Sequence, residues 1–237
     1  MKRNAIIFAA IFLAGSLGFS AQETRTLSLT AEGITHFEID CGAGFLKVQG
    51  VEGLKAIEVK AEINARGVDE KDMKKFIEDH VKLILENRGG RAVLVSEVKE
   101  RFFSPFHDVQ IDLTVSCPKK MHLNVDDSSG RMEIGSLAGN LDLNDGSGGV
   151  QVEGIQGDVE IDDGSGEIEV KDIAGNVSIE DGSGSMTVLN VGGNLTIDDG
   201  SGSIDIDGVG KDLILEDTGS GSVNYRNIKG RVIKHDN

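Results

Sequence analysis

The sequence contains no tryptophan, one tyrosine and only two prolines among its 237 residues. Between Met132 and Gly210 it has no aromatic residue, and Lys171 is the only basic residue of that stretch. Sites that cleave polysaccharides usually combine carboxylates with lysine or arginine beside aromatic platforms that bind the sugar. The scarcity of both types argues against a carbohydrate-active enzyme, which we retain only as a second alternative.

Basic residues are scarce in one half of the chain only. Residues 1–125 contain 17 acidic and 17 basic residues, whereas residues 126–237 contain 23 acidic and 7 basic residues. The second half therefore carries the whole formal net charge of −16. Nucleic acids and anionic membranes are bound through basic patches, so the sequence argues against both as partners.

Cysteine and histidine are also too few for the common kinds of catalytic or metal site. The two cysteines, Cys41 and Cys117, are too far apart in the sequence for a metal-binding motif. They could form a disulfide in an oxidising compartment, or they could be two separately buried thiols. No repeat unit before the C-terminal tail holds a histidine that could serve as a base for a serine, and His122, just before the repeats, is expected at the surface. We therefore predict no catalytic residue and no enzyme.

In place of these residues, the tract Asp127–Lys234 has a repeat of 18 residues. Each copy opens with Asp-Gly-Ser-Gly or a variant of it, and two short runs of alternating apolar residues follow. The last copy has one extra residue, Thr218, before its Gly-Ser-Gly. The copies open at Asp127, Asp145, Asp163, Asp181, Asp199 and Asp217.

An apolar period of two predicts strands with one face inward, and no helical spacing occurs in this tract. One unit cannot bury its apolar face alone, but stacked units share an interior. The glycines of Gly-Ser-Gly supply positive φ angles for one turn. A second corner carries Gly-Asn or Gly-Asp, as at Asn140 and Asp158, which tolerate left-handed turns and can hydrogen-bond along the stack. The fold class is therefore predicted as all-β, a single-stranded parallel β-helix or solenoid with 18-residue coils.

Stacking would place the turn carboxylates in columns, and these are the one repeated candidate site. Like charges about 4.8 Å apart repel by about 1 kcal/mol per pair in a water-like dielectric. Backbone N–H bonds to a turn carboxylate contribute about 1.5–3 kcal/mol. We therefore expect a structural turn role, with bound Ca²⁺ as the alternative. The candidate ligands are Asp145, Asp163, Asp181 and Asp199.

Residues 22–126 are predicted to be an irregular cap that is continuous with the repeats of residues 127–237. The stretch Phe37–Val51 matches a repeat unit and places Cys41 in the aspartate column, so the first coil begins there. A short amphipathic helix is expected within Val68–His80. The other expected elements are strands at Ile57–Ile63, Val81–Glu86, Ala92–Val98 and Val109–Val115.

The two ends of the stack need protection as open sheet edges. Phe102, Phe103 and Phe106 are expected to plug the interior at the N-terminal end, or else to form an exposed binding patch. At the C-terminal end the acidic pattern gives way to basic residues, which discourage end-to-end pairing. These residues are Arg226, Lys229, Arg231 and Lys234.

The chain opens with Lys2-Arg3, an apolar stretch at Ala5–Leu17, and small residues up to Ala21. This order is typical of a secretory signal peptide, and we predict one at residues 1–21. The alternative is an N-terminal membrane anchor, for which the apolar stretch is short. The expected location is the periplasm, the cell envelope or the extracellular space, with no membrane span in the mature chain.

These features together resemble a known family. The Asp-Gly-Ser-Gly repeats, the strand entering Val115–Pro118, the first coil at Ile39–Val51 and the leader are similar to bacterial β-strand-repeat proteins of unknown function. Proteins of this kind are often labelled adhesins, and the resemblance spans about Leu27–Val232. It implies an exported β-helix with no established catalytic residues. We expect a non-enzymatic binding or scaffold module whose partner is a protein or polysaccharide surface, with a calcium-stabilised stalk or coat protein as the first alternative.

Overall fold

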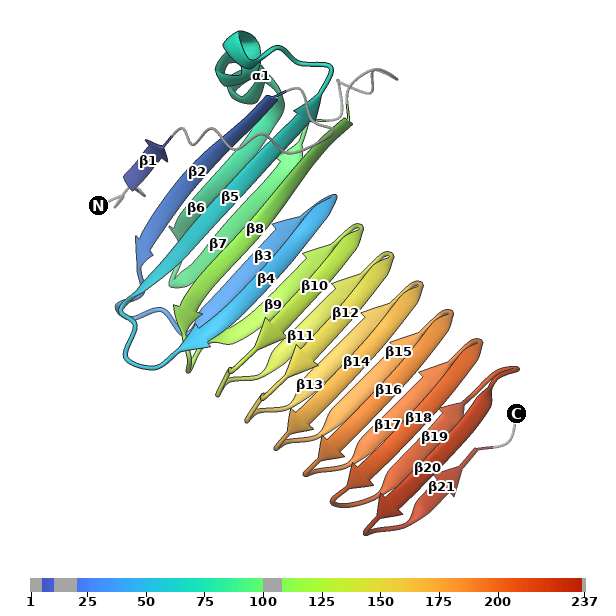
Figure 1. Cartoon of the computed structure of the whole chain (residues 1–237). Helices are drawn as coiled ribbons and strands as arrows, with labels where there is room; N and C mark the ends of the chain where they lie inside the picture. Colours follow the sequence, from blue (N-terminus) through green and yellow to red (C-terminus); the bar gives the residue numbers. More distant parts are fainter. Residues whose placement is uncertain (1–5, 11–20, 100–107, 236–237) are drawn as a thin grey trace.

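The computed structural model describes residues 6–10, 21–99 and 108–235. Its strands form two sheets that face each other and are joined coil by coil (Figure 1). Sheet A has 11 strands and sheet B has 10. One short α-helix and one 3₁₀ turn lie near the N-terminal end.

Listed in spatial order, the strands of sheet A are β1 (Ile6–Ala10), β2 (Ala21–Thr30), β5 (Ala56–Arg66), β8 (Asp108–Pro118), β4 (Gly44–Val51), β10 (Gly130–Gly135), β12 (Gly148–Glu153), β14 (Gly166–Ile173), β16 (Gly184–Val191), β18 (Gly202–Val209) and β20 (Ser222–Ile228). The strands of sheet B are β21 (Val232–Lys234), β19 (Leu213–Asp217), β17 (Leu195–Asp199), β15 (Val177–Asp181), β13 (Val159–Asp163), β11 (Leu141–Asp145), β9 (His122–Asp127), β3 (His36–Cys41), β7 (Arg91–Val98) and β6 (Val81–Arg88).

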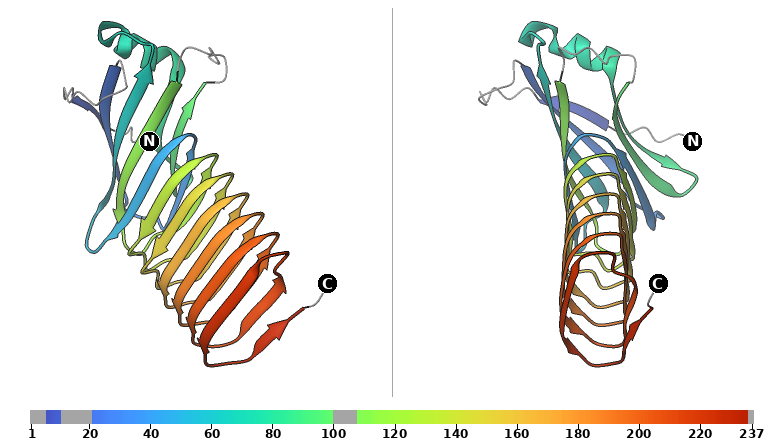
Figure 2. Two further views of the ribbon diagram at one scale, coloured as in Figure 1. Left: turned by 45° about the vertical axis from the view of Figure 1, so that its right-hand side comes forward. Right: turned by 90° about the vertical axis from the view of Figure 1, so that its right-hand side faces the viewer.

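The repeats form a parallel β-solenoid, as the sequence predicts. Each coil contributes one strand to each sheet, and each strand pairs in parallel with the strand one period away. Val150 pairs with Ile168 in sheet A, and Leu143 pairs with Ile161 in sheet B. The two sheets run side by side along a flattened column (Figure 2). The period of 18 residues is therefore also the period of the backbone hydrogen-bond ladder.

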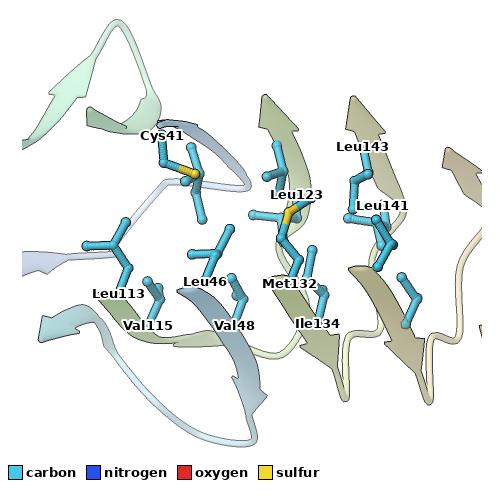
Figure 3. Packing of buried hydrophobic residues seen from close by; sticks show 14 of the residues in the cluster. Cys41, Leu46, Val48, Leu113, Val115, Leu123, Met132, Ile134, Leu141 and Leu143 are labelled. Atoms are coloured by element: carbon cyan, nitrogen blue, oxygen red, sulfur yellow. The ribbon is translucent and has the colours of Figure 1, made fainter. Parts of the chain in front are cut away.

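Stacking in register builds the core. In sheet A, Leu46 lies between Leu113 and Met132 in neighbouring strands. In sheet B, Leu123 pairs with Leu141 (Figure 3). The buried apolar side chains from Ala21 to Leu215, except Val93 and Val95, form one continuous cluster. Apolar burial along the column is thus shared between neighbouring coils, which no single coil could achieve alone.

The first coil begins where the sequence analysis placed it. β3 pairs in parallel with β9, and β4 pairs in parallel with β10, so Phe37–Val51 completes a coil. The strands expected within β5, β6, β7 and β8 are present, and β6 and β7 form an antiparallel hairpin.

One element of the N-terminal region is not predicted by the sequence pattern. β2 pairs antiparallel with β5, which pairs antiparallel with β8, so sheet A changes from parallel to antiparallel at this end. The sequence does not predict this strand because Glu23 occupies an inward position, where an alternating pattern requires an apolar residue. Glu23 is 9% exposed, and its Oε1 lies 2.8 Å from Nε of Arg25.

The N-terminal end is covered by the helix. α1 (Met73–His80) follows the 3₁₀ turn Glu70–Asp72 and contacts β2 of sheet A and β6 of sheet B (Figure 2). Its buried residues Met73, Phe76 and Ile77 join the core cluster. The predicted amphipathic helix is therefore confirmed, and it spans the gap between the sheets. The predicted plug of Phe102, Phe103 and Phe106 lies outside the described residues.

The C-terminal coil is held by the basic residues that the sequence placed there. Arg226 pairs with Asp207 at 2.9 Å, and Nζ of Lys234 lies 5.2 Å from the ring centre of Tyr225. The extra residue in the last turn shifts the register, so Asp198 pairs with Asp217 instead of the preceding residue. The aspartate column expected to include Asp217 is therefore interrupted there.

The Gly-Ser-Gly turn requires glycine at its last position because neighbouring backbones approach closely there. Gly148 has φ +147°, and a Cβ on it would lie 1.6 Å from the carbonyl oxygen of Gly130. At the second corner, the left-handed backbone expected at the Asn140 position is absent. The non-glycine residues with positive φ lie four residues earlier in the coil, at the position of Ser136. They are Ser136, Asp172, Asn190 and Asn227.

Substitution of Gly148 tests whether glycine is required at this position in particular, or whether any substitution in β12 destabilises the protein. Gly148→Ala should destabilise the protein by roughly 2–4 kcal/mol, because the added methyl group meets rigid backbone at a strained φ. Gly149→Ala is the matched control, since the nearest atom to its Cβ would be 3.8 Å away. Urea unfolding of both variants would measure the difference. Equal stability of the two variants would contradict the close approach.

Candidate functional site

The turns create two adjacent columns of acidic side chains on sheet B, as predicted. Asp145, Asp163, Asp181 and Asp199 follow one another in register. The residues before them, which form the outer column, also stack in register. The outer column consists of Asn144, Asp162, Glu180 and Asp198.

The two columns differ in direction. The outer column is exposed, whereas the second column points into the solenoid, at the edge of the apolar core. We call this second set the buried carboxyl column. Its members, with their exposed fractions, are Asp127 (3%), Asp145 (2%), Asp163 (2%), Asp181 (6%) and Asp199 (1%).

The parity of the strand explains the burial and was available in the sequence. Leu141 and Leu143 face inward, so Asp145, two residues further on, faces the same way. The same count applies in each coil. A water-like dielectric, which holds for exposed carboxylates, therefore does not hold for the buried carboxyl column.

Four of these aspartates make the hydrogen bond that a turn role calls for. The backbone N–H of the serine two residues later donates to Oδ1 in each case. For Asp145 and Ser147 the distance is 3.2 Å, and for Asp163 and Ser165 it is 3.1 Å. Asp181 and Asp199 make the same bond at 3.0 and 3.1 Å. One oxygen of each carboxyl group therefore closes the turn.

The second oxygen of each group has no partner. Oδ2 of Asp145, Asp163, Asp181 and Asp199 is buried without a hydrogen bond, and both oxygens of Asp127 are in the same state. Among the described residues, no lysine, arginine or histidine is buried, so no cationic side chain offsets these carboxylates. Buried polar atoms normally have partners, so this row of unpartnered oxygens is the main irregularity of the solenoid.

Burial changes the acidity of the column. It raises the pKa of Asp127 to about 7, and the pKa values of Asp163 and Asp181 to about 6. Burial also raises the pKa of Asp145 and of Asp199. The neighbouring carboxylate of Asp145 raises the pKa of both Asp127 and Asp163 further. The Cys41 thiol opposes the shift at Asp127, and the backbone N–H bond from Ser165 opposes it at Asp163. Burial is the largest cause throughout.

A fully ionised column would be costly. At an effective dielectric constant of about 20, charges about 4.8 Å apart repel by roughly 3–4 kcal/mol. The successive pairs from Asp127 to Asp199 would together cost on the order of 10 kcal/mol, which is comparable with the whole stability of a domain. A full set of negative charges would therefore oppose folding, and a positively charged ligand would relieve this cost.

The calcium role expected as the alternative for Asp145, Asp163, Asp181 and Asp199 stays a prediction. Among residues 21–99 and 108–235, no group of three or more His, Cys, Asp or Glu side chains is arranged to hold a metal ion. The turn bond to Oδ1 leaves each carboxyl group with one open oxygen.

Cys41 lies at the end of the buried carboxyl column, directly over Asp127. Cys117 lies in the other sheet, where it pairs with Gly50. Both are buried free thiols, which is the arrangement that the sequence analysis held as the alternative to a disulfide. Burial raises the pKa of Cys41, helped by the Asp127 carboxylate, and burial raises that of Cys117 to about 12.

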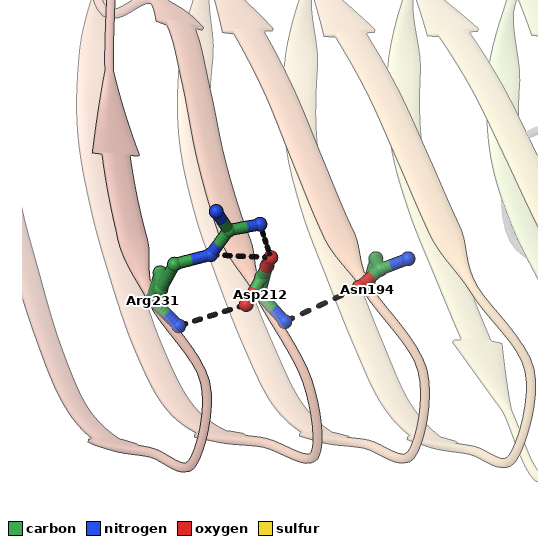
Figure 4. Close-up of polar contacts among 3 residues, drawn as sticks. All are labelled: Asn194, Asp212 and Arg231. Atoms are coloured by element: carbon green, nitrogen blue, oxygen red, sulfur yellow. Dashed lines mark hydrogen bonds and ion pairs between the residues drawn. The ribbon is translucent and has the colours of Figure 1, made fainter.

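The second corner forms a hydrogen-bonded ladder on the surface, as predicted for its Asn and Asp residues. Oδ1 of Asn140 accepts the backbone N–H of Asp158 at 3.1 Å, and each later side chain accepts from the next coil in turn. At the C-terminal end, Asn194 accepts from the N–H of Asp212, which in turn accepts from Arg231 (Figure 4). His122 begins the ladder. It is exposed as expected, and its Nδ1 accepts the N–H of Asn140.

Beside this ladder, a shallow groove of about 470 Å³ crosses the outward face of sheet B. Its floor includes one column of outward side chains from successive coils, Asp142, Glu160, Ser178 and Thr196. We call this column, together with the Asn/Asp ladder, the sheet B face. The Asn/Asp ladder returns once per coil, whereas the column beside it is acidic at Asp142 and Glu160 and continues through Ser178 and Thr196 to Ile214.

The state of the two thiols can be tested directly. Because both are buried with raised pKa values, they should not react with a thiol reagent at pH 8 in the native protein, and both should react after unfolding. The intact mass should correspond to two free thiols. A mass lower by two hydrogen atoms, with no reactive thiol after unfolding, would contradict this arrangement and show a disulfide.

No protein-family model matches the chain, and no curated protein is significantly similar to it. Solved structures from bacteria are similar to it. A candidate cell adhesion protein from Clostridium sporogenes is 15% identical over 91% of this chain and 100% of that chain, with a TM-score of 0.39. A candidate adhesin from Bacteroides fragilis is 10% identical over 90% and 97%, with a TM-score of 0.45.

A candidate lipid-binding protein from Parabacteroides distasonis is 17% identical over 90% of this chain and 94% of that chain, with a TM-score of 0.43. The names of the first two structures agree with the predicted resemblance to bacterial repeat proteins that are labelled adhesins. Similarity at these identities and TM-scores carries no argument about what this chain binds.

Proposed function

We propose that the protein is a non-enzymatic, exported β-solenoid that acts as a binding or scaffold module of the cell envelope. The observation that supports this most is the sheet B face, where an Asn or Asp side chain of the ladder returns in each coil from Asn140 to Asp212. A repeated surface of this kind binds through many weak contacts, whose combined affinity exceeds that of any one contact.

The chemistry of this face favours a partner with basic or hydroxyl groups. Asp142 and Glu160 lie next to each other in register, and the outer column adds Asp162 and Asp198. Carboxylates accept hydrogen bonds from sugar hydroxyl groups and attract lysine and arginine side chains. The partner is therefore a protein or polysaccharide surface that itself repeats.

Export is part of the proposal and rests on the predicted signal peptide at residues 1–21. Most of that segment lies outside the described residues, and Ile6–Ala10 form the strand β1, which pairs with β2. None of the described helices is long and apolar enough to cross a membrane.

Removal of one coil tests the repeated-contact mechanism. Deletion of residues 146–163 joins Asp145 to Gly164 at an equivalent point of the next coil, so the register of the stack is kept. Binding to immobilised bacterial envelope fractions should weaken several-fold, because fewer contacts form at once. Far-UV circular dichroism would check that the shortened protein is folded.

Gly149→Ala, which leaves all coils in place, is the matched control and should bind as the native protein does. Binding that is unchanged by the deletion would show that one local site is responsible. Turnover of a polysaccharide in the same fractions would favour the enzyme alternative over the binding function.

A calcium-stabilised stalk is the second candidate function. It is favoured by the exposed carboxylates of Asp162, Glu180 and Asp198, which succeed one another in register. In that case Ca²⁺ should raise the melting temperature and a chelator should lower it, because the ion binds only the folded state. Equal melting temperatures in the two conditions would remove this candidate.

A further inference from the structure

The buried carboxyl column has no part in the function proposed above. Its five side chains are at most 6% exposed, and each has at least one oxygen that is buried without a partner. The unpartnered oxygens are a separate observation from the clustering of acidic residues, since the turn bonds already account for the other oxygen of four of them. With no buried cationic side chain among the described residues, these oxygens call for a small, positively charged ligand.

We propose that this ligand is the proton, and that the column is a row of proton-binding sites in which carboxyl groups of neighbouring coils share protons. A protonated carboxyl group donates its O–H, and the carboxylate of the next coil accepts it. Successive strands lie about 4.8 Å apart, which brings successive side chains within reach of such a bond. Each shared proton neutralises one buried charge and gives a partner to two oxygens.

The geometry suits a proton better than a metal ion. Calcium takes about 6–8 oxygen ligands and magnesium requires near-ideal octahedral geometry. Each coil offers the interior one open carboxylate oxygen, at Oδ2 of Asp145, Asp163, Asp181 and Asp199. A proton needs only one donor oxygen and one acceptor oxygen, which two adjacent coils supply.

The titratable groups around the column are few. Cys41 lies over Asp127 at one end, and Asp217 lies near Asp199 at the other. The outward Asp162 and Asp198 add negative charge from the same strands. The inward side chains of the facing strands of sheet A are apolar, and they include Met132, Val150, Ile168, Met186 and Ile204. The neighbouring carboxylates favour proton uptake by the column, whereas the Cys41 thiol opposes it at Asp127.

Proton binding makes the solenoid more stable in mild acid than at neutral or basic pH. The folded pKa values of these aspartates lie above their ordinary value of 3.8, and they reach about 6 at Asp163 and about 7 at Asp127. The stabilisation is therefore fully present below about pH 4 and is lost as the pH rises through about 6–7. Between these limits folding takes up protons, and each proton changes the unfolding equilibrium constant about tenfold per pH unit.

The substitution Asp163→Asn tests this proposal. The asparagine keeps an oxygen for the N–H of Ser165 and presents an N–H₂ group to the next carboxylate, so it imitates the protonated state at every pH. In urea unfolding the two proteins should be nearly equal in stability only below about pH 4. At pH 8 the unfolding equilibrium constant of the variant should be about a hundredfold lower than the native value, because the pKa of Asp163 rises from 3.8 to about 6 on folding. The pH dependence should correspond to about one proton fewer.

The adjacent substitution Asp162→Asn is the matched control, since it removes the same charge from the exposed outer column. Its unfolding equilibrium constant should stay within about twofold of the native value at both pH values. If both variants change the pH dependence equally, general surface repulsion explains it and the proposal is wrong.

Two further measurements keep the proposal falsifiable if a variant folds poorly. A pH titration of the infrared C=O band of un-ionised carboxyl groups in the native protein should show groups that lose their proton only at about pH 6–7, and absence of such groups would overturn the proposal. Added Ca²⁺ should not change the stability at pH 8. A stabilisation by Ca²⁺ that Asp163→Asn abolishes would assign the open oxygens to a metal ion and overturn the assignment to protons.

Discussion

The structure depends on the parallel register between coils. Each strand hydrogen-bonds to the strand one period away, so every residue of the regular stack lies beside the residue 18 positions before it. A favourable contact is then multiplied along the column, as for the apolar residues of the core. A restriction is multiplied in the same way. Gly148 must be glycine because the carbonyl group of Gly130 occupies the space of its side chain, and Gly166 meets Gly148 in the same manner.

Polar residues satisfy this register in two different ways. At the surface corner, the side chain of Asn140 accepts the backbone N–H of Asp158, and the pattern continues to Arg231 at the last coil. An amide or a carboxylate serves equally there, because the donor is the backbone and water screens the charge. Inside the solenoid, four of the aspartates also accept backbone N–H groups, but their second oxygens are buried without a partner. Aspartate therefore accepts backbone hydrogen bonds at both corners, but only inside the solenoid does burial raise its pKa.

The N-terminal region ends the stack by leaving the repeat. β3 and β4 still form a coil, but β2, β5 and β8 turn sheet A antiparallel, and α1 covers the gap between the two sheets. This change of pairing prevents another coil from being added at that end. At the other end, Arg226 and Arg231 pair with acidic residues of the preceding coil, so the last coil is tied back to the stack. A solenoid closed at one end and charged at the other presents mainly its long faces to partners.

The sequence by itself determined the solenoid, its period, the first coil at Phe37–Val51 and the helix near Met73, because apolar period and turn residues are local signals that repetition reinforces. It also contained the parity that turns Asp145 inward, two residues after Leu143. Only the tertiary structure decided how deeply that carboxyl group is buried, because a turn follows it and burial there depends on the neighbouring coils. The strand β2 also appears only in the tertiary structure, because its inward Glu23 interrupts the alternation of apolar residues. The tertiary structure likewise places Cys41 and Cys117 in different sheets. These outcomes depend on contacts between distant segments, which local spacing does not encode.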